Sequence, residues 1–503
     1  MSTFQMLTFS FLVELVFYVV IIFISLYLYF TRNFNHWKNK NVPYFKPLPF
    51  VGNVYNGVLM RDSMGEIFSD LYNKTMKPFI GFFILDKPCL LLRDPQLIKR
   101  VLISDFQHFY DRNILNNKRD DPISTHMLFF LKNPEWKDIR GKITPVFSSS
   151  KIKIMSRLIE DVGQEMVDYL EKNAMLDSTV DMKDVSLRFT VDVIGTAVFG
   201  VNAHSFQNAN CKFNEIAQKL FNWDDTLTAF RIRCYFLTPM IAKLFRMKFI
   251  HPYCANFLKK SFLEIMDRRI ASKVSRNDLI DILLQLKTND KQFMDGDILV
   301  AQAVMFFAAG FETTSSTIAF ALHELAQHPD IQNKLRQEID LISGKHDGIN
   351  YDSLKEMEYL DMCVKEVLRK YPVLPFLDRK TATNYDIPGT DVIIEKDTPV
   401  FIPILALHND PRYFANPEVF NPERFSKTNI NNIEHFVYMP FGEGPRNCIG
   451  ARFGKLTTKL GLAYVLKSFV VEKTCFTEAK IRFNPKGVTL SPFKGMKLKL
   501  RKV

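Results

Sequence analysis

One apolar segment, residues 297–329, constrains the fold more than any other part of the sequence. The segment is predicted to form a helix with apolar side chains on nearly every side, so this helix has to be buried inside a large domain. It nevertheless carries Glu312, Thr313 and Thr314 beside Gly310, and buried polar groups cost free energy unless they are paired. Two interpretations stay open. In one, a ligand meets a locally opened helix where an acid and an alcohol handle protons; in the other, helices pack closely at Gly310 and the hydroxyls bond to the backbone.

A second apolar run, residues 11–30, is long enough to cross a bilayer core, which requires about 20 apolar residues. Glu14 opposes insertion, but it lies near the end of the run, where its carboxylate can reach the headgroups. A cleaved signal peptide is the alternative, although its apolar part would be shorter. Because basic residues follow the run, we expect residues 1–31 to be a membrane anchor with the rest of the chain in the cytosol; they are Arg32, Lys38, Lys40 and Lys46.

The remaining chain is predicted to form one large domain, mainly α with a minor β part. Residues 32–50 form a basic, proline-containing linker, which is typical of a stiff extended connector. From about residue 60 the pattern is mostly helical, residues 88–95 and 391–403 resemble strands, and no linker-like break divides residues 51–503. Residues 220–258 mix aromatic and basic side chains, which predicts either a second membrane contact or core helices with a basic outer face.

Charge and cysteine content narrow the possible partners. The chain has 66 Lys and Arg against 54 Asp and Glu, and this net charge of +12 favours anionic partners. No basic block with interleaved aromatic residues indicates nucleic-acid binding, so we expect none. The seven cysteines are odd in number and scattered, which indicates neither a disulfide framework nor a zinc cluster.

Cys448 differs from the other cysteines because it lies in an unusual loop, "FGEGPRNCIG", at residues 441–450. Its glycines, Gly442, Gly444 and Gly450, let backbone amides turn towards a sulfur anion, and Arg446 adds a cation. We therefore expect a lowered thiol pKa and a thiolate, which serves as a metal ligand or as a nucleophile. A nucleophilic cysteine would require a histidine base, and nothing marks any of the ten histidines as one.

Two further residue pairs are suggestive only in combination with this loop. Glu366 and Arg369 are three residues apart on one predicted helix face, where they can form an ion pair. Trp136 and Arg140 of "WKDIR" are four apart, so an indole N–H and a guanidinium can point together at an anionic group. Each pair alone is also typical of an ordinary solvated helix face.

Taken together, these motifs resemble those of the cytochromes P450. The loop has every fixed residue of the family's haem-binding signature F-x-x-G-x-R-x-C-x-G. The other motifs, "WKDIR", "AGFETT", "EVLR" and "PERF", follow in the family's order. The resemblance extends from the anchor to the C-terminus and is greatest to microsomal, detoxifying enzymes of insects. It implies the cytochrome P450 fold with a single haem-binding domain.

The resemblance also implies roles for individual residues. Cys448 would be the axial ligand of a haem b iron, with Phe441 against the same side of the haem. Glu312 and Thr313 would deliver protons to dioxygen, for which Ala309 and Gly310 leave room. The haem propionates would be held by Trp136, Arg140, Arg379, Arg446 and Arg112. A buried structural network would consist of Glu366, Arg369 and Arg424.

The implied reaction is monooxygenation, with electrons from NADPH delivered by cytochrome P450 reductase and with cytochrome b5 as a further partner. Candidate docking residues are Lys137, Lys142 and Lys455, and the implied location is the endoplasmic reticulum membrane. Two rivals are an isomerase or dehydratase acting on peroxides without a reductase, and a haem protein that only sequesters hydrophobic ligands. Members of the first kind typically lack the acid and alcohol found at Glu312 and Thr313.

By similarity, the substrate pocket is mostly apolar, so we expect a small lipophilic substrate held by burial of apolar surface. Xenobiotics such as plant toxins or insecticides fit, and endogenous steroids, terpenoids or fatty acids are the alternative. The residues expected in this pocket are Phe129, Phe130, Met305, Ala309, Val373, Leu374 and Thr489.

Overall fold

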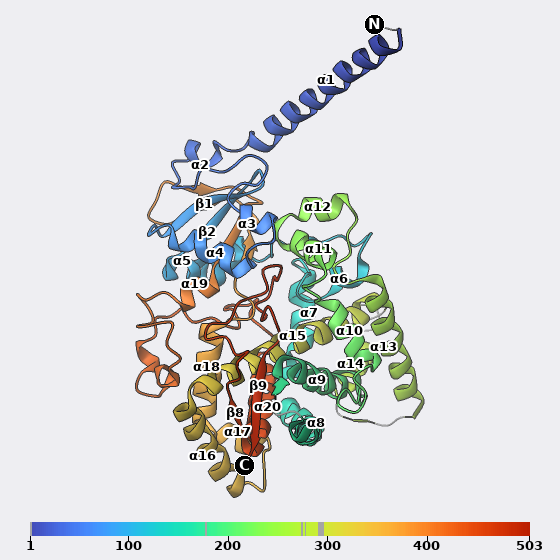
Figure 1. The fold of residues 1–503 in the computed structure, drawn as a ribbon, viewed down its shortest axis with the longest axis vertical. Helices are drawn as coiled ribbons and strands as arrows, with labels where there is room; N and C mark the ends of the chain where they lie inside the picture. Colours follow the sequence, from blue (N-terminus) through green and yellow to red (C-terminus); the bar gives the residue numbers. More distant parts are fainter. Residues whose placement is uncertain (1–2, 177–178, 273–274, 277, 290–295) are drawn as a thin grey trace.

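A computed structural model gives the structure of residues 3–176, 179–272, 275–276, 278–289 and 296–503. Residues 1–2 of the expected anchor lie outside this description. Helix α15 (Asp297–Gln327) crosses the middle of the molecule (Figure 1) and 78% of its most apolar 18-residue stretch is buried. It packs against α9 (Met182–Ile194), α18 (Glu358–Lys370) and α20 (Ala451–Ser468). The prediction that this segment is a buried helix is confirmed.

Other helices surround α15, and sequence signals fix several of their ends. Ser63 and Glu66 form a reciprocal cap at the start of α4, and Pro329 occupies the first turn of α16, where its missing N–H costs nothing. These helices are α3 (Tyr55–Val58), α4 (Met64–Asn73), α5 (Pro95–Lys99), α6 (Pro122–His126), α7 (Glu135–Ile143), α8 (Ser149–Leu176), α10 (Lys212–Leu220), α11 (Thr226–Leu237), α12 (Pro239–Leu244), α13 (Pro252–Ser272), α14 (Leu279–Asn289), α16 (Pro329–Lys345), α17 (Tyr351–Glu356) and α19 (Ile404–His408).

Three small sheets make up the β part. The largest has the strand order β1-β2-β7-β4, in which β2 and β7 are parallel and the other pairs antiparallel. Strands were predicted at residues 88–95 and 391–403, and the structure confirms them as β2 and as β6 with β7. The strands are β1 (Phe79–Ile84), β2 (Lys87–Leu92), β7 (Pro399–Ile402) and β4 (Leu377–Lys380), then β3 (Thr179–Asp181), β9 (Lys497–Lys502) and β8 (Phe469–Glu472), and finally β5 (Tyr385–Asp386) with β6 (Ile393–Ile394).

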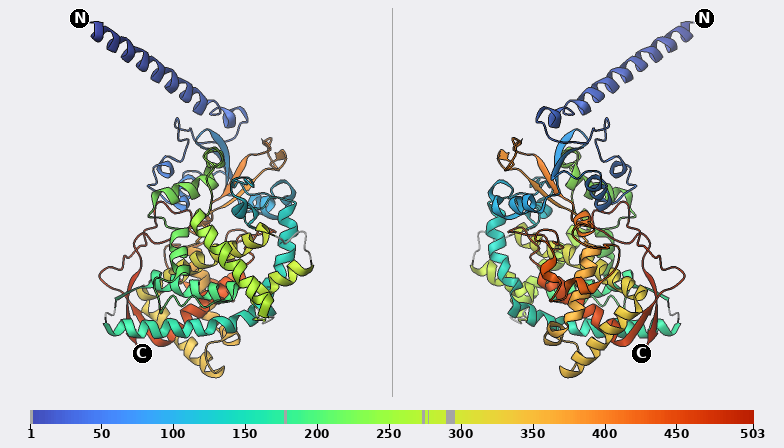
Figure 2. Two further views of the ribbon diagram at one scale, coloured as in Figure 1. Left: turned by 90° about the vertical axis from the view of Figure 1, so that its right-hand side faces the viewer. Right: turned by 90° about the vertical axis from the view of Figure 1, so that its left-hand side faces the viewer.

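Helix α1 (Thr3–Thr31) projects away from the rest of the molecule in every view (Figures 1 and 2). All side chains of residues 11–29 are exposed, and the mean hydropathy of the span is 2.6. A helix that exposes apolar side chains on all sides is stable in lipid, because its backbone hydrogen bonds are satisfied internally. This helix is therefore a candidate membrane anchor, as the sequence predicts.

The residues between α1 and β1 pack onto the sheet. The indole of Trp37, in α2 (His36–Asn39), is fully buried and donates to the carbonyl of Phe82 over 3.3 Å. A Cβ at Gly81 would lie 2.5 Å from Trp37 Cγ, so glycine is required there. Phe50 then packs on Phe30 of α1, with ring centroids 5.5 Å apart. The Trp37 contacts hold this segment against the sheet, and the Phe50 contact joins it to α1, so residues 32–50 are packed more tightly than the extended connector expected from the prolines.

Gly310 is explained by helix packing. A Cβ there would lie 2.5 Å from Ile194 Cδ1 of α9, so glycine lets α15 and α9 approach closely. The Thr313 hydroxyl donates to the carbonyl of Ala309 over 2.8 Å, and α15 continues through this turn as an unbroken α-helix. The local opening considered from the sequence is therefore absent, because the hydroxyl bonds to the turn without displacing the helical hydrogen bonds.

A buried ion pair fixes the C-terminal end of α18. Glu366 and Arg369 are both fully buried, and two guanidinium nitrogens donate to the carboxylate over 2.8 and 2.9 Å. Arg424 donates to the same carboxylate over 3.3 Å, and Arg369 also donates to the carbonyls of His408 and Pro417. Every strong donor therefore has a partner, which a buried pair requires to offset the cost of desolvation.

His408 connects this ion pair to the loop that carries Cys448. Its Nδ1 lies 3.3 and 3.2 Å from the carbonyls of Leu368 and Arg369, and its Nε2 accepts from the Met439 N–H over 2.9 Å. Since both partners of Nδ1 are acceptors, the proton is on Nδ1 and the ring is neutral. Burial, reinforced by the Arg369 charge, lowers the pKa of His408 to about 3.

Glu366→Ala tests the contribution of the ion pair. We expect a loss of about 3–5 kcal/mol in the free energy of unfolding, because the Arg369 charge stays buried without its partner. Glu358→Ala is the matched control on the same helix, since its partner Lys427 is exposed, and we expect a loss below about 1 kcal/mol. Urea unfolding of the detergent-solubilised protein measures both. Equal losses would contradict this account of the network.

The neutral His408 ring predicts acid sensitivity. With a folded pKa of about 3 against 6.5 when unfolded, only the unfolded chain takes up a proton between these values. Its stabilising contribution is therefore complete above pH 6.5 and is lost as the pH falls towards 3. Between pH 7 and pH 5, the wild type should lose about 2 kcal/mol more than His408→Gln, which cannot titrate. Parallel unfolding curves at the two pH values measure the difference, and equal losses would refute it.

Candidate functional site

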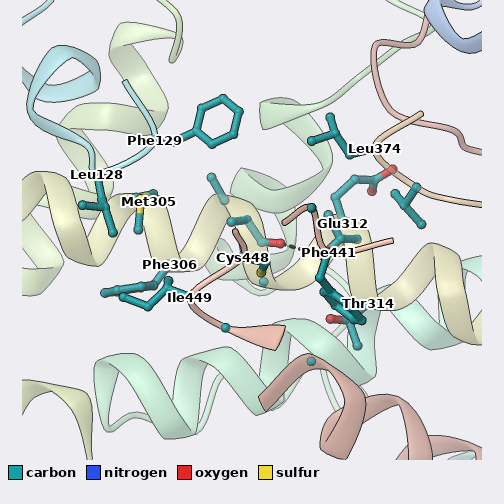
Figure 3. Close-up of a pocket in the computed structure, with 18 of the residues that line it drawn as sticks. Leu128, Phe129, Met305, Phe306, Glu312, Thr314, Leu374, Phe441, Cys448 and Ile449 are labelled. Carbon is teal, nitrogen blue, oxygen red and sulfur yellow. Dashed lines mark hydrogen bonds between the residues drawn. The ribbon is translucent and has the colours of Figure 1, made fainter. Parts of the chain in front are cut away.

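A cavity of about 360 Å³ lies between α15 and the loop around Cys448. Figure 3 shows Cys448 beside the middle of α15, where Met305, Phe306, Glu312 and Thr314 follow one another along the helix. Most lining side chains are apolar. The cavity collects almost every residue that the sequence nominated for a ligand site: Arg112, Phe129, Phe130, Trp136, Arg140, Met305, Ala309, Glu312, Thr313, Val373, Leu374, Arg379, Phe441, Arg446, Cys448 and Thr489. Glu366, Arg369 and Arg424 lie behind the loop and do not line it.

The Cys448 loop is held open towards this cavity. Gly444 has a φ of +74°, and a Cβ there would lie 2.1 Å from the carbonyl oxygen of Leu102, so only glycine fits. The Cys448 N–H donates to the Phe441 carbonyl over 2.8 Å. On the other side, Arg140 donates to the backbone and side-chain oxygens of Asn447, each over 2.8 Å. The Cys448 side chain faces this internal cavity, so it is exposed to that space although protein surrounds it.

The expectation of a lowered thiol pKa is wrong for the protein alone. Burial raises the pKa of Cys448, and the Gly450 N–H and the charges of Arg140 and Arg112 only partly oppose this. Arg446, expected to help, points elsewhere, to the carbonyls of Tyr110 and Leu131. A thiol with a raised pKa is a poor nucleophile, and no histidine lines the cavity in the part of the chain that the structure describes. A bound metal cation would supply the charge that a thiolate needs here.

Arginines crowd one end of the cavity. The Arg446 guanidinium lies 4.0 Å from the Trp136 ring centroid, and its Nη2 is 3.2 Å from Asp111. Arg379 is buried and donates to the backbone carbonyl of Asp378 over 2.8 Å, and the Asp378 carboxylate accepts from Arg112 over 3.3 Å. The two carboxylates therefore pair with Arg446 and Arg112, whereas Arg379 bonds to a backbone carbonyl.

This charge imbalance matches an anionic ligand. Burial, reinforced by the Arg112 charge, lowers the pKa of Arg446 to about 8 and that of Arg379 to about 9. Arg446 Nη1 and Arg379 Nε are buried and have no hydrogen-bond partner among the described residues. An anionic group in the cavity would satisfy Arg446 and Arg379. Lys132, which the sequence did not indicate, has a pKa lowered by burial to about 8, but it donates to the carbonyl of Arg112 and does not line the cavity. The thiol, the apolar walls and this cationic end therefore fit a haem with its two propionates.

Glu312 is held by a partner that the sequence did not reveal. Lys183 Nζ, from α9, lies 3.2 Å from Glu312 Oε2 and also donates to the hydroxyls of Ser315 and Ser316. The Ser316 hydroxyl donates to Glu312 Oε1 over 3.4 Å. Glu312 lies at the cavity wall as a paired, buried carboxylate beside Thr313. An acid and an alcohol therefore line the cavity together, and Figure 3 shows Glu312 on the part of α15 that lies beside Cys448.

The distal wall includes residues from the segment 220–258, for which the sequence predicted either a second membrane contact or core helices with a basic outer face. Trp223 and Phe249 line the cavity, as do Ile232 and Phe236 of α11. The segment also exposes apolar side chains, since Leu227, Met240 and Leu244 are each at least 75% exposed. One face of this segment therefore lines the cavity and the other is exposed. Helical periodicity in the sequence did not show which residues belong to which face.

The cytochrome P450 family model matches residues 42–500. The chain is similar to cytochrome P450 6j1 of Blattella germanica, with 38% identity over 98% of both chains. It is also similar to cytochrome P450 6a2 of Drosophila melanogaster, with 36% identity over 97% of this chain and 99% of that one. The chain therefore belongs to the cytochrome P450 family of haem-dependent monooxygenases.

Proposed function

We propose that this protein oxidises small lipophilic xenobiotics, such as plant toxins or insecticides, at a haem bound in the cavity. The observation that carries the proposal is the composition of the cavity, which joins a thiol and a cationic end to an otherwise apolar wall. Apolar walls bind a substrate by removing its surface from water, at roughly 25 cal/mol per Å². Such walls impose few polar requirements, which suits a range of lipophilic compounds.

In this proposal the cavity residues hold the haem from two directions. Cys448 would ligate the iron, and Phe441, which lines the same cavity, would pack against the haem. The propionates are held by Arg112, Trp136, Arg140, Arg379 and Arg446, which is supported by the unpartnered nitrogens of Arg379 and Arg446. The thiolate-ligated haem supplies the activation of dioxygen.

The protein's own contribution to the chemistry is the control of protons. Thr313 presents its hydroxyl at the cavity wall, where the Ala309 carbonyl fixes its direction. Glu312 lies next to it, and Lys183 holds the carboxylate in place. The Thr313 hydroxyl, which donates to Ala309 in this structure, would turn towards the cavity to donate its proton there, and Glu312 would take up a proton from the interior before replacing it. The apolar remainder of the wall limits the access of other water.

Electrons come from NADPH through cytochrome P450 reductase, with cytochrome b5 as a second donor. The net charge of +12 supports docking of an acidic partner. Lys137 is exposed and available, whereas Lys142 pairs with Asp138 over 2.9 Å. Lys455 lines the cavity with its Nζ 5.4 Å from the Phe441 ring centroid, so it is the weakest of the three docking candidates.

The protein resides in the endoplasmic reticulum membrane with its catalytic domain in the cytosol. Residues 1–31 are the anchor, residues 32–50 lead from it to the domain, and residues 51–503 are catalytic. The exposed apolar side chains of Leu227, Met240 and Leu244 support a second contact with the lipid. They belong to α11 and α12, and α12 lies towards the end of the molecule from which α1 emerges (Figure 1).

Turnover under ¹⁸O-labelled dioxygen tests the proposed function. The full-length protein is combined with reductase, NADPH and a panel of plant toxins and insecticides, with steroids, terpenoids and fatty acids for comparison. We expect one ¹⁸O atom in products of the first group and lower rates with the second. Products from the endogenous compounds alone would overturn the xenobiotic assignment, and loss of NADPH dependence would overturn the electron source.

Thr313→Val and Thr313→Ser serve as matched variants in the same assay. Valine keeps the shape and removes the proton donor, so it should lower the product formed per NADPH consumed by about tenfold. Serine keeps the hydroxyl and should restore most of the yield. If valine matched the wild type, Thr313 would have no part in proton control.

A further inference from the structure

Arg233 of α11 is a buried arginine bound entirely by backbone carbonyls. It is 4% exposed, and its Nη1 donates to Gly57 over 2.7 Å and its Nε to Lys486 over 3.0 Å. Its Nη2 donates to the carbonyl of Asp62 over 2.8 Å and also to that of Pro485. Burial lowers the pKa of Arg233 to about 10, so the side chain remains charged at neutral pH. One guanidinium therefore joins three segments that are far apart in the sequence.

The turn at residues 484–487 is tied to α11 by further bonds. Lys486 Nζ donates to the Asp224 carbonyl over 3.0 Å and to the Thr226 hydroxyl over 2.8 Å. Asn484 donates to the Asp224 carboxylate over 3.2 Å. The turn itself is tight, because a Cβ at Gly487 would lie 2.6 Å from the carbonyl oxygen of Thr489. Unlike Lys486 and Asn484, Arg233 also donates to carbonyls within residues 57–62.

These bonds join two walls of the distal cavity. Ile232 precedes Arg233 and lines the cavity, as does Phe236 one turn later. Val488 and Thr489 follow the tight turn and line the same space. Separating the turn from α11 would therefore open the cavity between these walls, and that separation breaks the Arg233 bonds.

The surface outside this joint is apolar. Leu227 of α11 is 78% exposed, and Phe230 is also exposed. Across the joint, α3 exposes Tyr55 and Val58, and Leu59 follows them. A lipophilic compound that partitions onto this surface would reach the joint before it reaches the cavity. The buried polar bonds thus lie between an apolar exterior and an apolar interior.

We propose that Arg233 is the latch of a gate between α11 and the turn at residues 484–487, through which lipophilic compounds pass between the apolar surface and the distal cavity. The gate rests on the proposed function, since it assigns the passage to lipophilic substrates. Breaking the latch changes the rates of passage in both directions and leaves the bound state intact, because the guanidinium contacts only backbone outside the cavity lining.

The kinetics of azole binding to the purified, full-length haem protein test the latch. A bulky azole, clotrimazole, is mixed rapidly with the protein and its binding is followed by the Soret absorption. Arg233→Met should raise its association and dissociation rates by about tenfold each, with little change in Kd. Arg233→Lys retains a donor that reaches fewer of the carbonyls and should give an intermediate rate. The small ligand imidazole should bind at unchanged rates.

Arg231→Met is the matched control on the same helix. It removes the same charge, but Arg231 Nε and Nη2 have no hydrogen-bond partner among the residues that the structure describes. This variant should keep wild-type rates for both azoles. Equal acceleration in Arg231→Met, or unchanged rates in both Arg233 variants, would overturn the latch.

Amide hydrogen exchange gives a readout that does not depend on haem chemistry. Arg233→Lys and Arg233→Met should speed exchange in residues 57–62 and 484–490 selectively. Uniform acceleration over the whole chain would show a general loss of stability and would overturn the assignment, as would exchange that matches the wild type. If Arg233→Met does not fold, the lysine variant decides alone. None of these measurements requires turnover, so a working latch in a protein that forms no product would contradict the proposed function only.

Discussion

The burial of α15 is the constraint on which the rest of the structure depends. A helix that is apolar on nearly every side has to be covered on every side, and α9, α18 and α20 pack against it. Gly310 shows how tight this packing is, because a Cβ there would collide with Ile194. In such a helix, polar side chains occur only where a partner or a cavity receives them. Glu312 meets both conditions, with Lys183 on one side and the cavity on the other, and Thr313 lines the cavity while its hydroxyl donates to the Ala309 carbonyl.

The electrostatics of the cavity are unfavourable in the protein alone and complementary to its cofactor. Burial raises the pKa of the Cys448 thiol, and it lowers the pKa of Arg379 and Arg446. Both pKa shifts arise because burial imposes a free-energy cost on the charged form of these side chains. An iron cation at the sulfur and two carboxylates at the arginines would remove that cost, and a haem would supply both. The ion pair of Glu366 and Arg369, connected through His408 to Met439, keeps the loop in position for this.

Local patterns predicted the parts of the site that are local in sequence. The sequence indicated three local features: the glycines around Cys448, the spacing of Glu366 and Arg369, and the polar residues in α15. The family resemblance then connected these features to one site. Contacts between distant segments were not readable. Lys183 lies 129 residues from Glu312, and Arg233 reaches the turn at 484–487 some 250 residues away. The sign of the Cys448 pKa shift also depends on burial, which a ten-residue motif does not contain.

The central claim is that Cys448 ligates a haem iron, and the carbon monoxide difference spectrum of the reduced protein tests it most directly. Wild type and Cys475→Ser, which changes the other exposed cysteine, should both give the long-wavelength Soret band of a thiolate-ligated haem. Cys448→Ser should lose it. An unchanged band in Cys448→Ser, or a wild-type protein that binds no haem, would contradict the account.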